Sequence, residues 1–227
     1  MPDEKSFPGS AAEFDYQKSV QKKDNQFTSK FFPINKFLNR PLANLIVRAI
    51  YRTKISPNHL TLVSFVIGLA GGYLFYRGQA WSFAAGGILA QLSSIVDCAD
   101  GQLARAREKA SEFGAYLDLM LDRLGEFFLL AGVMVGCFKY FGRPGIFMLG
   151  LFTIGVYFLQ TTLFYLTQSY RKRAQSGEAA EMRAWLLFLM LIFGVVNRLD
   201  IGIYFLLVVC LGINLYLIVA FLFLKRA

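Results

Sequence analysis

The chain has 227 residues, of which 56% are hydrophobic and 17% charged, and its mean hydropathy is +0.45. A soluble domain of this length usually carries about a quarter charged residues, so the composition excludes an ordinary soluble protein and indicates an integral membrane protein. The net charge of +9 could indicate a nucleic-acid partner. The placement of the basic residues, described below, favours anionic lipid headgroups or a phosphate substrate instead.

Residues 1–32 are polar and mixed in charge. They contain no apolar run of the kind that a cleavable signal peptide needs. We expect a poorly ordered cytoplasmic tail here.

Residues 33–55 predict an amphipathic juxtamembrane helix that lies on the cytoplasmic face of the membrane. Asn39, just before Pro41, is a plausible cap for its start. On the polar side we place Lys36, Arg40, Asn44, Arg48 and Arg52. On the apolar side, at helical spacing, we place Ile34, Phe37, Leu38, Pro41, Leu42, Leu45, Ile46, Ala49 and Ile50.

Residues 56–227 predict an all-α transmembrane domain of six helices, because long apolar segments alternate with short polar connections. Ser56-Pro57-Asn58 marks the entry into the first span, and His59, the only histidine, is interpreted as an interfacial residue. The fifth span has the shortest apolar stretch. The expected spans are 59–76, 80–105, 112–140, 144–170, 182–197 and 200–224.

The basic residues set the expected orientation. Nineteen of the 24 Lys and Arg residues lie before the first span, in or beside the connections that follow the second and fourth spans, or at the C-terminal end. Only four lie in or beside the connections that follow the first, third and fifth spans. Short loops rich in Lys and Arg stay in the cytoplasm. Both termini are therefore expected to be cytoplasmic.

Four aspartates interrupt the second and third spans: Asp97 and Asp100 near the end of one, Asp118 and Asp122 near the start of the next. Each pair lies within ~60° on its helix, and the connection 106–111 is short, so the two pairs should converge. A carboxylate inside a membrane helix costs about 2.5–3.5 kcal/mol. A bound divalent cation would offset that cost, and an all-oxygen cage suits one or two Mg²⁺ or Mn²⁺ ions better than zinc.

The residues around the aspartates extend this site toward a phosphate-bearing ligand. Gly101, Ala104 and Gly114 are small enough to leave room beside the carboxylates, and Arg105 could hold a phosphate by its fork of donors. Magnesium in such sites usually keeps positions open for substrate phosphates. The pattern favours phosphoryl transfer, in which one carboxylate takes the proton of the attacking hydroxyl.

These residues carry a resemblance to a known family. The pattern from Asp97 to Asp122 resembles the signature of the CDP-alcohol phosphotransferases at each defining position. Pro57-Asn58-x2-Thr61 is similar to that family's first span. The resemblance covers roughly residues 34–224 and rests on Asp97-x2-Asp100-Gly101-x2-Ala104-Arg105-x8-Gly114-x3-Asp118-x3-Asp122.

The resemblance implies an enzyme that transfers a substituted phosphate group from a CDP-alcohol to an acceptor alcohol and releases CMP. It implies two Mg²⁺ or Mn²⁺ ions, a homodimer and an active site open to the cytoplasm. Asp122 would be the general base. The metal ligands would be Asp97, Asp100, Asp118 and Asp122. The CDP pocket would be lined by Asn58, Thr61, Gly101, Ala104, Arg105 and Gly114.

The acceptor is less strongly indicated. Asn39-Arg40-Pro41, and Asp122-Arg123 followed by Glu126, resemble the branch that makes inositol-containing phosphodiesters. A pocket for such an acceptor could include Arg123, Glu126 and Arg183. A phosphatidylglycerophosphate-type or aminoalcohol-type lipid synthase stays open within the family.

Two other classes also stay open. A prenyltransferase holds a diphosphate on aspartate-bound Mg²⁺ but normally separates its aspartate clusters widely in sequence. A carboxylate-site cation transporter would give no reason for the Gly, Ala and Arg residues beside the aspartates. Release of CMP from a CDP-alcohol would separate the phosphotransferase from both.

Overall fold

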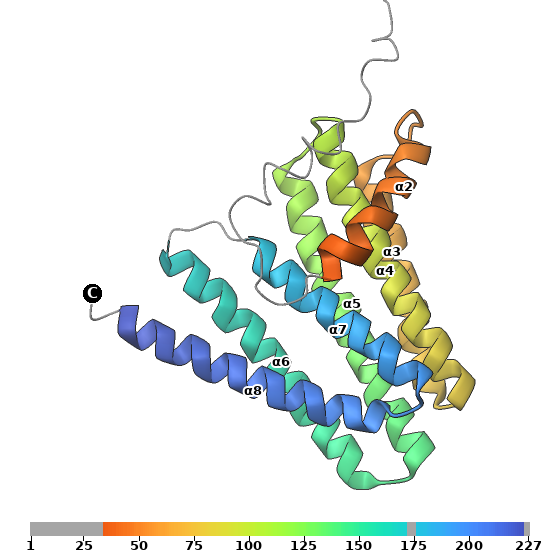
Figure 1. The fold of residues 1–227 in the computed structure, drawn as a ribbon, viewed down its shortest axis with the longest axis vertical. Helices are drawn as coiled ribbons and strands as arrows, with labels where there is room; N and C mark the ends of the chain where they lie inside the picture. Colours follow the sequence, from red (N-terminus) through yellow and green to blue (C-terminus); the bar gives the residue numbers. More distant parts are fainter. Residues whose placement is uncertain (1–33, 172–175, 225–227) are drawn as a thin grey trace, which may run out of the picture.

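The structure is a computed structural model that describes residues 34–171 and 176–224. Each regular element in these ranges is a helix, and Figure 1 shows the helices as an elongated bundle. The expected tail, residues 1–32, lies outside the described residues. The elements are η1 (Asn35–Asn39, a π-helical turn), α2 (Arg40–Ile50), α3 (Pro57–Arg77), α4 (Ala80–Ala106), α5 (Glu112–Phe141), α6 (Pro144–Arg171), α7 (Ser176–Val195) and α8 (Leu199–Leu224).

The ends of α3 show how the chain starts and stops its long helices. Ser56 and His59 form a reciprocal cap, in which the Ser56 hydroxyl accepts from the His59 backbone N–H and the Ser56 N–H donates to His59 Nδ1. Gly78, with a φ of 65°, ends the helix in the left-handed conformation that glycine adopts without strain. The single histidine thus has a structural role.

Within the described ranges, five helices are long and apolar enough to cross a membrane: Pro57–Arg77, Ala80–Ala106, Glu112–Phe141, Pro144–Leu166 and Leu199–Val219. The predicted helical segments agree with the structure, apart from α7, which begins earlier than expected. The apolar part of α7, Met182–Val195, is shorter. It would span only about 21 Å at the rise of an α-helix, against ~30 Å for a hydrocarbon core.

Glycines bring the backbones of α3 and α5 into direct contact. A Cβ at Gly132 would collide with the Gly72 carbonyl, and a Cβ at Gly136 would collide with the Phe75 carbonyl. Helix α4 packs against α2, α3 and α7, while α6 pairs with α8 and leans away from the other helices in Figure 1. The helices that carry the four aspartates are therefore held in a tightly packed part of the bundle.

The first helical segment is continuous from Ile34 to Ile50, and the expected cap at Asn39 is wrong. Asn39 is fully buried: its amide donates to Asn35 Oδ1 (2.8 Å) and Ser94 Oγ (2.9 Å), and Gln91 Nε2 donates to its Oδ1 (2.5 Å). Asn44, expected on the polar side, is also buried. At Asn39, the hydrogen-bond partners on α4 compensate for the loss of water.

Candidate active site

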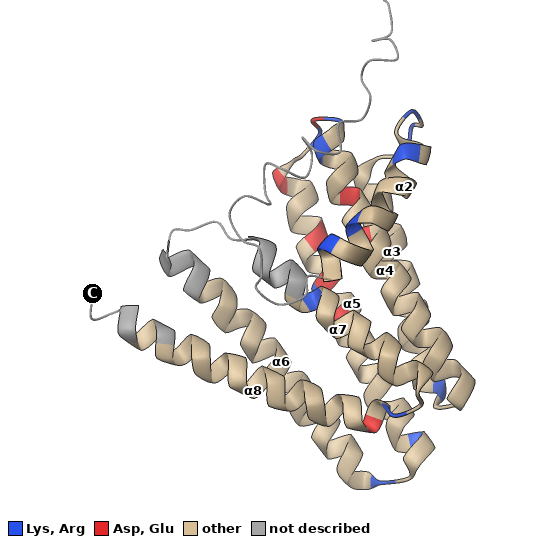
Figure 2. Cartoon of the chain, in the orientation of Figure 1, with Lys and Arg blue, Asp and Glu red and all other residues tan. Residues whose placement is uncertain are grey.

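The structure brings three of the four aspartates together. Asp97 and Asp100 on α4 and Asp118 on α5 each offer a carboxylate oxygen, and these oxygens all lie within 4.8 Å of one another. The Thr61 hydroxyl, on the second turn of α3, donates to Asp100 Oδ2 at 2.6 Å. Figure 2 shows most acidic residues of the long helices gathered on α4 and α5, at the end of the bundle near α2.

The cluster fits a divalent cation. Asp97 Oδ1 and Asp118 Oδ1 are buried, and neither has a hydrogen-bond partner among the described residues. Three carboxylates this close repel one another unless a positive charge lies between them. An all-oxygen donor set is the one that Mg²⁺ and Mn²⁺ prefer. Asp97, Asp100 and Asp118 could therefore hold such an ion.

The fourth aspartate, Asp122, lies outside this three-carboxylate set and contacts an arginine from α7. Arg183 NH2 is 2.8 Å from Asp122 Oδ1, and Arg183 NH1 is 2.6 Å from Asp97 Oδ2. Its Nε also lies 3.4 Å from Glu126 Oε1. One buried guanidinium thus connects a possible metal ligand to the expected general base.

The three expected acceptor-pocket residues lie next to one another. Glu126, whose side chain is 1% exposed, accepts from Arg123 NH2 at 2.8 Å and also faces Arg183. Arg123 Nε and NH1 are buried with no hydrogen-bond partner in the part of the chain that the structure describes. Arg123 borders a cavity of about 270 Å³ whose other lining residues are Tyr157, Thr161, Phe164, Tyr165 and Met182.

A cleft of about 810 Å³, measured with its open mouth, adjoins the carboxylate cluster. The six residues expected to bind CDP all line it, together with Asp100 and Asp118. Small residues keep it open: a Cβ at Gly114 would lie 3.2 Å from Asn58 Oδ1, and one at Gly101 would lie 3.2 Å from Arg105 NH1. The remaining lining residues are Pro57, Lys109, Ala110, Ser111 and Ala115.

Sequence reasoning missed three residues of this region. Lys109 lines the cleft from the α4–α5 connection, and Tyr157 on α6 lines the cavity that Arg123 borders. Arg107 donates to the segment that precedes α3. Tyr157 and Arg123 are too far apart in the sequence for their spacing to indicate that they line one cavity. Lys109 and Arg107 resemble any other basic residue at the end of a span.

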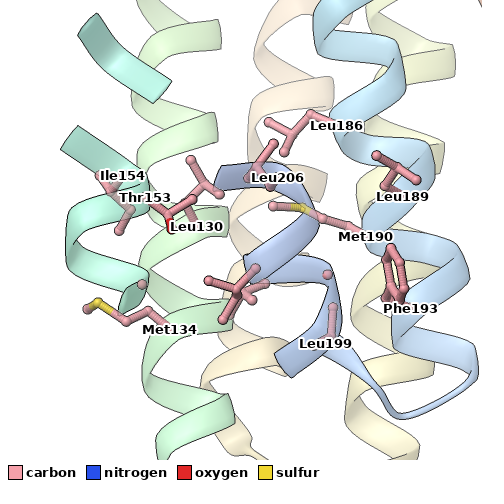
Figure 3. A pocket seen from close by; sticks show the side chains of 14 residues that line it. Leu130, Met134, Thr153, Ile154, Leu186, Leu189, Met190, Phe193, Leu199 and Leu206 are labelled. Atoms are coloured by element: carbon pink, nitrogen blue, oxygen red, sulfur yellow. The ribbon is translucent and has the colours of Figure 1, made fainter. Parts of the chain in front are cut away.

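A separate apolar pocket, of about 450 Å³ when its open side is included, lies among α5, α6, α7 and α8. Figure 3 shows Leu130, Met134, Thr153, Met190 and Leu206 around it, and no charged side chain lines it. Leu130 is about 12 Å farther along α5 than Asp122 at helical rise. This apolar cavity therefore lacks the groups for the chemistry expected at the aspartates.

Comparison with known proteins agrees with this geometry. The sequence model of the family described as CDP-alcohol phosphatidyltransferase matches residues 54–224. The archaetidylinositol phosphate synthase of Pyrococcus horikoshii is 30% identical over 156 residues, which are 66% of this chain and 74% of that protein. The bifunctional IPC transferase and DIPP synthase of Archaeoglobus fulgidus is 39% identical over 98 residues, or 43% of this chain.

The chain spans about a fifth of the length of the bifunctional relatives, 19% for the Archaeoglobus fulgidus protein. Among solved structures, phosphatidylinositol phosphate synthase of Mycobacterium tuberculosis with CDP-DAG bound is similar in fold. Its TM-score is 0.65 at 20% identity, and the similarity covers 79% of this chain and 92% of that one. The family match covers most of the chain and includes the carboxylate cluster and the cleft; the chain therefore belongs to the CDP-alcohol phosphatidyltransferase family.

Proposed function

We propose that this chain is an integral membrane enzyme that transfers a substituted phosphate group from a CDP-alcohol to an acceptor alcohol. The products are CMP and a phosphodiester. One observation carries the proposal: the cleft and the carboxylate cluster share Asp100 and Asp118. A diphosphate in the cleft would therefore lie beside the position suited to a divalent cation.

The carboxylate cluster and the cleft have distinct roles in the proposed reaction. Asp97, Asp100 and Asp118 would hold Mg²⁺ or Mn²⁺, which when bound neutralises the diphosphate charge. With Asp122 the four carboxylates offer enough oxygens for two ions. Arg105 and Lys109 supply positive charge along the cleft for the phosphates.

Asp122 would accept the proton of the attacking hydroxyl, since a carboxylate within reach of that hydroxyl can act as general base. Its contact with Arg183 orients it from one side. The acceptor oxygen then forms the new bond to the β-phosphorus of the donor, and the bond from that phosphorus to the bridging oxygen of CMP breaks. CMP leaves with the electron pair of the broken bond.

For the acceptor we propose a phosphorylated inositol-type polyol. One relative bears the name archaetidylinositol phosphate synthase, and one structural neighbour bears the name phosphatidylinositol phosphate synthase. Arg183 already contacts three carboxylates, whereas Arg123 retains two buried nitrogens for an anionic group. The acceptor phosphate would thus bind to Arg123, and Glu126 would hold both arginines in place.

We also propose the finer membrane arrangement. In it α7 forms a sixth span together with its polar start, both termini and the active site face the cytoplasm, and the enzyme is a homodimer. The segment formed by η1 and α2 would lie at the membrane surface, because Phe37 on η1 and Leu45 on α2 are 59% and 62% exposed although the other face of the segment is buried on α4. Exposed apolar side chains beside buried polar ones suit an interfacial helix.

An assay of CMP release tests the proposed function. The purified protein in lipid nanodiscs is given CDP-diacylglycerol, CDP-inositol, CDP-choline or CDP-ethanolamine, each with inositol phosphate, glycerol phosphate or no acceptor. We expect acceptor-dependent CMP release that requires Mg²⁺ or Mn²⁺. Absence of CMP with all donors would refute the transferase, and preference for glycerol phosphate would refute the proposed acceptor.

A further inference from the structure

Arg107, at the C-terminal end of α4, binds a segment that is distant in sequence. Its Nε donates to Tyr51 O at 3.2 Å, and its NH2 group lies 2.8 Å from Ile50 O, 2.7 Å from Tyr51 O and 2.9 Å from Thr53 O. NH1 donates to Ile55 O. One guanidinium therefore holds four backbone carbonyls between α2 and α3.

The carbonyls that Arg107 binds lie where a helix ends and an irregular segment begins. Those of Ile50 and Tyr51 are at the end of α2, whose last turn leaves carbonyls without intrahelical donors, and Ile50 O also accepts from the Thr53 N–H and hydroxyl. A cation at this end also interacts favourably with the helix dipole. Thr53 and Ile55 belong to the irregular connection that leads to Ser56, the cap of α3. Arg107 thereby fixes both the end of α2 and the approach to α3.

This contact lies next to the cleft. Pro57 and Asn58, directly after the held segment, line one wall of the cleft, and Arg105, two residues before Arg107, lines another. The backbone of the α4 end is itself fixed, because Lys109 N–H donates to Ala104 O at 2.9 Å. The Arg107 hydrogen bonds thus cross-link these two walls, in addition to the hydrogen bond from Thr61 to Asp100.

We propose that Arg107 is a positioning residue for the cytidine diphosphate half of the cleft. It sets the distance between the start of α3 and the end of α4, so that Asn58 and Arg105 are arranged before the donor arrives. The apparent Kd for the nucleotide rises as the inverse of the fraction of molecules that keep the competent arrangement. This inference rests on the proposed function, since it needs a nucleotide in the cleft.

Binding of CDP in the presence of Mn²⁺, measured by calorimetry on the full chain, tests the inference without requiring turnover. Arg107→Gln removes the charge, and Arg107→Lys keeps it but lacks the planar fork that reaches several carbonyls. Arg52→Gln is the matched control, because Arg52 is an exposed cation in the same segment. Binding of Mn²⁺ alone reports on the carboxylates.

We expect both Arg107 variants to bind CDP about tenfold more weakly, with Arg52→Gln and the affinity for Mn²⁺ alone unchanged within about twofold. In turnover, the KM for the donor should rise by a similar factor while kcat at saturating donor stays constant. Wild-type affinity for CDP in Arg107→Gln would overturn the inference alone. So would loss of folding or of Mn²⁺ binding in both variants, which would make Arg107 a general structural residue. Failure of the wild type to bind CDP would overturn the proposed function, and this inference with it.

Discussion

The hydrogen bond from Thr61 to Asp100 makes a sharp prediction about the metal site. Thr61 is 4% exposed and Asp100 is 6% exposed, and the hydroxyl lies 2.6 Å from Asp100 Oδ2. Thr61→Val keeps the shape of the side chain but removes the hydroxyl that donates to Asp100. A hydrogen bond to a charged group contributes about 1.5–3 kcal/mol.

That free energy corresponds to a roughly 10- to 150-fold change in an equilibrium constant, at ~1.4 kcal/mol per factor of ten. It matches the ~10- to 100-fold effect typical of residues that orient a metal ligand. We therefore expect Thr61→Val to weaken Mn²⁺ binding by at least about tenfold, because Asp100 loses the donor that fixes its carboxylate.

Titration of Mn²⁺ by electron paramagnetic resonance measures this affinity in the absence of substrate. Thr61→Ser is the control, since it keeps the hydroxyl and should bind Mn²⁺ within about threefold of the wild type. If the valine variant binds Mn²⁺ as tightly as the serine variant, Thr61 does not orient Asp100 toward a cation and the reasoning is refuted.

Three further variants test the base, the buried ion pairs and the helix contact. Asp122→Asn should bind CDP like the wild type but lose nearly all CMP release; full turnover would contradict its role as base. Arg183→Gln should lower the stability toward thermal unfolding by about 3–5 kcal/mol, because it leaves buried carboxylates without their partner, and Arg123→Gln, which has one such contact, should cost less. Gly132→Ala should destabilise by about 3 kcal/mol through collision with the α3 backbone, whereas Gly125→Ala, with its nearest neighbour 3.6 Å away, should unfold like the wild type.

The positions of the long helices were predictable because they depend on runs of apolar residues bounded by glycine, proline and polar caps. Asn39 shows where this reasoning fails. Asparagine before Pro41 has the local signature of a cap, but Gln91 and Ser94 on α4 provide buried partners for its side chain. Only the packing of α2 on α4 reveals that contact.

The candidate site likewise has one part that the sequence predicts and one part that it does not. The carboxylate cluster and the cleft residues from Asp100 to Asp118 follow one another on α4, α5 and the short turn that joins them, so helical spacing alone brings them together. Arg183 comes from α7, and neither the spacing nor the composition indicates that it joins Asp97 to Asp122. Long-range ion pairs leave no periodic signal in a sequence.

The glycine contacts between α3 and α5 have a consequence for motion. Two backbones in direct contact have no side chains between them that could change rotamer, so α3 cannot slide along α5 without a steric collision. Helix α7 meets α4 in a similar way, since a Cβ at Gly87 would lie 2.8 Å from Leu191 Cα. Helices α3, α4, α5 and α7 carry the four aspartates and their partners Thr61 and Arg183, and these contacts hold the four helices together as a stiff unit.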